Sequence, residues 1–181
     1  MQNGATVSRG LRVAGLAKHS GALPTESLIR DLLYRFEVWT VLECHAVQLA
    51  ALSAIRDLRH ARAISTGLER IMAVPGSPDW NWLEVELHRA IDDQSGNQVL
   101  AAMAERTHRE VQEASERYSR GPMRTPEALS RIQSQHHTIL SCIEAGQVDA
   151  AVQHTRAHLN FLRDATVDRL KGEIAQFSFV T

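Results

Sequence analysis

The chain has 181 residues, with 20 Lys and Arg against 21 Asp and Glu, and therefore a formal net charge of −1. This length suits one domain with a sizeable core, and the balanced charge lacks the basic excess that is typical of a nucleic-acid-binding surface. No apolar run approaches the ~20 residues that cross a bilayer, and the first twenty residues lack the apolar stretch of a signal peptide.

Residues 1–24 hold four of the ten glycines and show little helical periodicity. We interpret them as an N-terminal arm, extended or disordered, in which Ala5–Val13 could form a short hairpin around Gly10. Pro24 and Thr25 then mark the beginning of a helical region that covers residues 25–175.

Apolar residues at spacings of three and four predict six helices in this region. They cover roughly residues 26–52, 53–74, 79–92, 98–119, 125–145 and 148–171, with breaks at segments rich in proline, glycine or serine. Short breaks favour antiparallel neighbours, so we predict an all-α fold, an antiparallel bundle of six to seven helices. Cys44 and Cys142 lie in no metal or redox spacing and are typical of free thiols in a reducing cytoplasm.

The third predicted helix carries an acidic residue and a histidine on its inward side. Trp80, Leu83, Leu87 and Ile91 form its apolar stripe, and Glu84 and His88 lie four residues apart at the edge of that stripe. Because an unpartnered buried carboxylate is unfavourable, the pair either satisfies itself by hydrogen bonding or binds a metal ion.

Two more histidines occupy inward positions on the last two predicted helices, His136 and His158. With Glu84 and His88 they would give a site in the bundle core for one divalent transition metal, Zn, Ni, Mn or Fe. Spacing alone leaves alternatives open: His137 adjoins His136, His154 lies one turn from His158, and inward histidines are often only hydrogen-bonded core residues. We expect His19, His45, His60 and His108 to be surface or structural residues.

Four segments resemble the FCD domain, the effector-binding domain of the FadR type in GntR-superfamily bacterial transcription regulators. They are Phe36–Glu43 with Ala46–Ala51, Glu84–His88 with Ser95–Leu100, Gln135–Leu140 with Ile143–Ala151, and Arg156–Leu159. Their order and spacing over roughly residues 30 to 165 carry the resemblance, which implies an all-α bundle with a metal in its core.

The resemblance implies that Glu84, His88, His136 and His158 bind the metal, and it selects His136 over His137 and His158 over His154. It further implies that a small organic acid binds beside the metal and changes the affinity of an attached DNA-binding domain. Two residues depart from the family pattern: Glu84 stands where Asp is more common, and Trp39 where many members have an effector-binding arginine. The effector-binding residues therefore stay unknown, with Trp39 as a candidate: either the pocket is more apolar than usual, or another arginine replaces the missing one.

The sequence thus predicts the sensor domain of a GntR-type regulator, cytoplasmic and a homodimer, and not an enzyme. About 25 residues precede the first predicted helix, so DNA binding would depend on a winged helix-turn-helix that is not complete in this sequence, of which residues 1–24 resemble at most the end of a wing. One alternative is a stand-alone metalloenzyme, in which an open metal position activates water. Another is a structural bundle whose histidines are only hydrogen-bonded.

Overall fold

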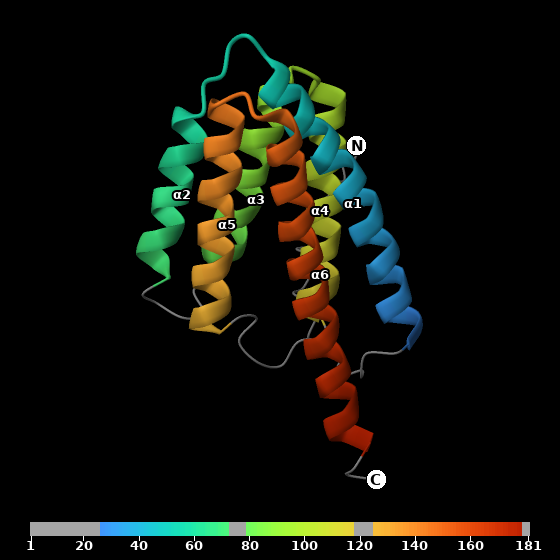
Figure 1. Ribbon diagram of the computed structural model, residues 1–181. Helices are drawn as coiled ribbons and strands as arrows, with labels where there is room; N and C mark the ends of the chain where they lie inside the picture. Colours follow the sequence, from blue (N-terminus) through green and yellow to red (C-terminus); the bar gives the residue numbers. More distant parts are fainter. Residues whose placement is uncertain (1–25, 73–78, 118–124, 179–181) are drawn as a thin grey trace, which may run out of the picture.

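All regular secondary structure in the described part of the chain is helical. The computed structural model describes residues 26–72, 79–117 and 125–178. Figure 1 shows its elements: α1 (Glu26–Leu52), α2 (Arg59–Ile71), α3 (Asp79–Asp92), the short 3-10 helix η1 (Asp93–Ser95), α4 (Gln98–Arg117), α5 (Pro126–Glu144) and α6 (Val148–Ser178). The predicted all-α class is confirmed, whereas the suggested hairpin at Ala5–Val13 and the rest of the arm at 1–24 lie outside the described residues.

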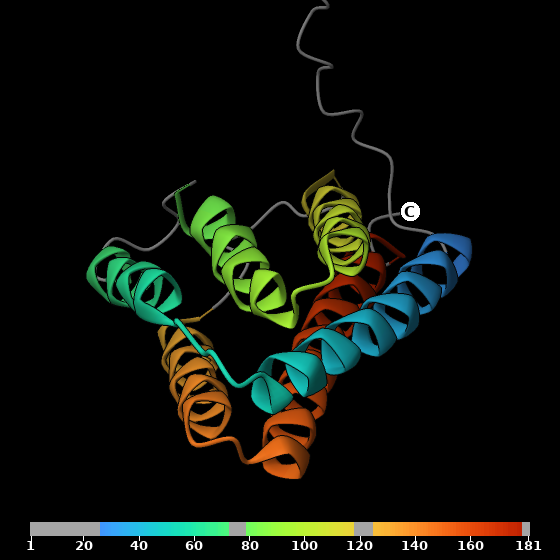
Figure 2. The same cartoon turned by 90° about the horizontal axis from the view of Figure 1, so that it is seen from above.

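The six α-helices form a closed ring around the core. Seen from above, each helix packs on two neighbours in the order α1, α4, α3, α2, α5 and α6, and α6 returns to α1 (Figure 2). Successive helices run in opposite directions, so ring neighbours are antiparallel (Figure 1). Helix α1 also contacts α3 and α5 across the interior, which brings residues distant in sequence to one central region.

The core combines large apolar side chains with an unusual number of buried polar ones. The buried polar and charged residues are Glu43, Ser65, Glu84, His88, Asp92, His108, Ser115, Gln133, His136, Thr155 and His158. Burying such groups is unfavourable unless they find hydrogen bonds or bind an ion, so their clustering marks a site. None of the described helices combines the length and the apolar character that a membrane crossing requires.

The second helix begins six residues later than its predicted beginning at Ser53. The backbone N–H of Ser53 still donates to Leu49 and Ala50 at the end of α1, and the Asp57 carboxylate accepts from the Arg59 backbone N–H at the beginning of α2. These local side-chain and terminal hydrogen bonds compete with a continuous helix. Ile55, an apolar residue within the range predicted for this helix, is 83% exposed in the connection.

The last two helices are close to their predicted bounds at the turn that joins them. Helix α5 begins after Thr125, whose hydroxyl oxygen accepts the Ala128 backbone N–H at 3.2 Å, and Pro126 takes the first helical position. Helix α6 continues to Ser178, seven residues beyond the predicted end at Lys171. Gly172 follows the predicted end directly, but the helix continues through it, and Ile174 beyond it still packs against the core. Tertiary packing therefore outweighs the low helix propensity of glycine here.

Candidate metal centre

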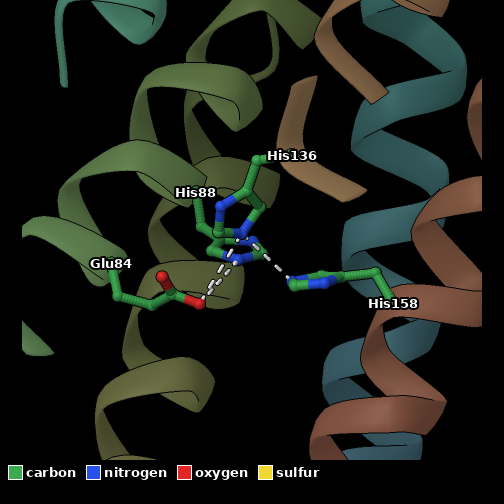
Figure 3. A group of neighbouring side chains, drawn as sticks. All are labelled: Glu84, His88, His136 and His158. Carbon is green, nitrogen blue, oxygen red and sulfur yellow. Dashed lines mark hydrogen bonds and ion pairs between the residues drawn. The ribbon is translucent and has the colours of Figure 1, made fainter. Parts of the chain in front are cut away.

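One carboxylate and three imidazoles converge in the middle of the ring. Glu84 and His88 lie on α3, His136 on α5 and His158 on α6, and Figure 3 shows their side chains directed toward one another. All four are buried, with exposures between 0 and 3%. One ligand-type atom from each lies within 4.8 Å of the other three. The structure thus brings together all four residues that the sequence analysis assigned to one site.

Distances within the cluster are close to those expected around a single ion. The two Nε2 atoms of His136 and His158 are 3.2 Å apart. The Glu84 Oε1 atom lies 3.6 Å from Nε2 of His136 and 3.9 Å from Nε2 of His88. Two donor atoms that each bind a transition metal at ~2.1 Å lie about 3 to 3.5 Å apart. Small side-chain adjustments would therefore bring the four groups into coordination distance.

The environment of Glu84 supplies an independent test of the fit. Both of its carboxylate oxygens are buried, and neither has a hydrogen-bond partner within the described residues. A buried carboxylate without hydrogen bonds is strongly unfavourable, whereas a cation held between it and the imidazoles would offset the loss of hydration. Oxygen and imidazole nitrogen together suit zinc, nickel, manganese and iron. The donor set therefore fits a divalent transition metal.

Asp92 is a further buried carboxyl group close to the cluster. It lies one helical turn after His88, is 1% exposed, and neither carboxylate oxygen has a hydrogen-bond partner in the described ranges. Burial raises the pKa of Asp92 well above its ordinary value, and the nearby charge of Glu43 raises it further. A cation bound nearby would stabilise the ionised form of this carboxyl group.

The neighbouring histidines that spacing left as alternatives lie elsewhere. His137 has a side chain that is 42% exposed, and its Nε2 lies 2.6 Å from the Glu69 carboxylate on α2. His154 is exposed on α6 and does not belong to the cluster. His45 and His60 are also exposed, and His19 lies outside the described residues. The choice of His136 and His158, which the resemblance implied, agrees with the geometry.

Several groups around the cluster had not been assigned to the site. The Glu43 carboxylate lies 2.5 Å from Nδ1 of His88, and the Gln135 amide oxygen lies 3.1 Å from Nδ1 of His158. His108, expected to be a surface or structural residue, is 1% exposed, and its ring stacks on that of Trp39 at a centroid distance of 4.0 Å. Helical periodicity could have indicated that Glu43 and Asp92 are buried, because each follows an inward-facing residue by one turn. It could not indicate which residues of other helices they contact.

The fold and the cluster together define an all-helical domain built around a polar site in its core. The model of the FCD domain family matches residues 35–161, a range that contains Glu84, His88, His136 and His158. The chain therefore belongs to the FCD family, whose domain is the C-terminal effector-binding domain of GntR-type regulators of the FadR type. No curated protein matches the chain. Membership confirms the resemblance seen in the sequence and indicates a ligand-sensing regulatory domain.

Proposed function

We propose that this chain is a metal-dependent sensor of small organic acids in a GntR-type transcription regulator. One divalent transition metal would be held by Glu84, His88, His136 and His158. The observation that carries the proposal is the convergence of these four buried donors from three helices on one point, with Glu84 otherwise lacking hydrogen bonds in the described residues. FCD domains belong to transcription regulators, which favours this function over a stand-alone metalloenzyme.

Coordination would link α3 to α5 and α6, neither of which adjoins α3 in the ring. Helix α3 packs between α2 and α4, whereas α5 and α6 form the opposite side (Figure 2). An ion held by α3, α5 and α6 would therefore fix the distance across the bundle. A ligand that changes this coordination can shift helix positions, which is the physical requirement for passing a signal to an attached winged helix-turn-helix.

The proposed effector is a small organic acid that binds the metal directly. Four protein donors leave two positions open on a six-coordinate ion, and a carboxylate oxygen suits the same metals as the protein ligands. Trp39 remains the candidate for contact with the rest of the effector, because its ring centroid lies 5.3 Å from that of His88. The enclosed, desolvated setting would strengthen the interaction between the acid and the ion.

The proposed regulator is a homodimer that acts on DNA in the cytoplasm. Two neighbouring helices, α1 and α4, expose apolar side chains at one-turn spacing, namely Tyr34, Val38 and Val41 on α1 and Val99 and Met103 on α4. Contiguous exposed apolar surface commonly marks an interface between proteins. A second copy of the same domain is the partner that a dimeric regulator would place there.

A thermal-shift screen of small organic acids tests the effector proposal. We expect at least one acid to raise the melting temperature of the metal-loaded protein, since a ligand that binds only the folded state stabilises it. The same acid should give no shift after the metal has been removed by chelation and dialysis. An acid that stabilises the metal-free protein equally would contradict binding through the metal, and a screen without any stabilising acid would contradict the effector class.

A further inference from the structure

Two buried residues on α1 lie on the side of His88 that faces away from the other candidate metal ligands. Trp39 and Glu43 lie one turn apart, and each is 1% exposed. The indole N–H of Trp39 donates to Oε2 of Glu43 at 2.8 Å, and the other carboxylate oxygen lies 2.5 Å from Nδ1 of His88. Both oxygens of this buried carboxylate are thus engaged, one by an indole and one by an imidazole.

The second contact fixes which nitrogen of His88 faces the cluster. When Nδ1 carries the hydrogen that it donates to Glu43, the lone pair of the ring is on Nε2. Nε2 is the atom that faces Glu84, at 3.9 Å from its Oε1. A hydrogen bond to the far nitrogen therefore selects the tautomer and the ring orientation that a metal needs, as carboxylates do behind many histidine ligands.

We propose that Glu43 is a positioning residue for His88 and that Trp39 in turn positions Glu43. The inference rests on the proposed metal site and adds residues that would set its affinity and geometry. A carboxylate suits this position because it accepts hydrogen bonds at both oxygens. Glutamine has only one acceptor oxygen, and its NH2 group would require an acceptor at the other end.

The surroundings of Trp39 and of His158 support this assignment. The indole ring stacks on His108 with an interplanar angle of 21°, and its centroid lies 5.8 Å from that of Phe36, so its N–H is held in one direction. On the other side of the cluster, Gln135 places its amide oxygen 3.1 Å from Nδ1 of His158. The chain thus provides an acceptor at the far nitrogen of two candidate ligands, each from a residue outside the cluster.

Cobalt binding by Glu43→Gln tests the proposal, because Co²⁺ reports affinity and coordination geometry through its visible absorption. We expect Glu43→Gln to weaken Co²⁺ binding ~10–100-fold, the usual effect of removing such a partner, and to alter the absorption spectrum. Trp39→Phe keeps an aromatic ring but removes the indole N–H, so it should produce a smaller change in the same direction. The circular dichroism spectrum of each metal-free variant reports whether it folds.

Ser65→Ala is the matched control. The Ser65 hydroxyl is buried and accepts a hydrogen bond from Gln133 at 2.7 Å, in a contact between α2 and α5 that does not touch the cluster. Its loss removes a buried hydrogen bond and should leave both Co²⁺ affinity and the absorption spectrum unchanged. A purely structural role for Glu43 would instead give the same unchanged cobalt readouts in Glu43→Gln.

The outcomes separate this proposal from the one on which it rests. If the wild-type protein binds no Co²⁺, the proposal of a metal site is wrong, and the proposed positioning role of Glu43 is wrong as well. If the wild type binds and Glu43→Gln binds with the same affinity and spectrum, the site stands and the positioning role is wrong. Should Glu43→Gln fail to fold, Trp39→Phe decides: wild-type affinity and spectrum in that variant overturn the proposal, and weaker binding with an altered spectrum supports it.

Discussion

Gly146 lies in the turn between α5 and α6, where the backbone takes a left-handed conformation. Its φ is +66°, a left-handed conformation that residues with a Cβ atom rarely adopt. A Cβ atom at this position would also lie only 2.9 Å from Nη2 of Arg56, in the connection between α1 and α2. The guanidinium of Arg56 donates in turn to the Ala51 carbonyl at the end of α1. The backbone conformation therefore requires glycine here, and a Cβ atom would in addition displace the flexible Arg56 side chain from its contact with Ala51.

Substitution of Gly146 by alanine should destabilise the protein by more than the ~1 kcal/mol that the left-handed conformation alone costs. Gly96 provides the control, because its φ is +70° and a Cβ atom there would meet nothing within 4 Å. Urea denaturation of both variants should show the larger loss for Gly146→Ala. Equal losses would mean that the Arg56 contact adds nothing to the requirement for glycine.

At the scale of the helices, apolar periodicity predicted which segments are helical, and that neighbouring helices are antiparallel, better than it predicted where each helix begins and ends. The stripes on α3 and α5 gave bounds that agree with the structure to about one residue. The beginning of α2 was misplaced because Ile55 continued an apolar spacing, although local hydrogen bonds at Ser53 and Asp57 end one helix and begin the next. Whether an apolar residue is buried depends on the partner helices, which a single stripe does not specify.

The exposed apolar stripes on α1 and α4 yield a prediction about assembly. Val38, in the middle of the α1 stripe, is 51% exposed, so Val38→Asp should leave the fold intact while placing a charge in the proposed dimer interface. Sedimentation velocity should show a dimeric wild type and a variant shifted toward monomer. Trp82→Asp is the control, since Trp82 is 57% exposed on α3, away from both stripes, and should not affect assembly. A monomeric wild type, or a variant that dimerises equally well, would contradict this interface.

At the scale of the whole molecule, the site forms because the ring brings α3, α5 and α6 to one point. Inward periodicity marked Glu84, His88, His136 and His158 in the sequence, but it could not separate His158 from His154. Residues one turn apart differ by only about 40° around a helix axis, so both can satisfy the same stripe. The resemblance to the FCD family supplied that choice, which the buried cluster now supports.

Contacts between helices could not be read from the sequence in the same way. Glu43 lies 45 positions before His88, and their contact depends on how far α1 and α3 are rotated toward each other. The stacking of His108 on Trp39 likewise requires α4 to pack beside α1. Periodicity places a residue inside or outside a bundle, whereas the identity of its partner requires the relative positions of two helices.

Metal content of the purified protein tests the central claim most directly. After loading with Zn²⁺ and removal of the excess by dialysis, elemental analysis should find about one metal per chain, since a single cluster provides the ligands. His158→Ala should lose most of this metal, because it removes a donor from the core, whereas His154→Ala should retain it. A wild-type protein without metal, or metal lost from His154→Ala and kept by His158→Ala, would contradict the account.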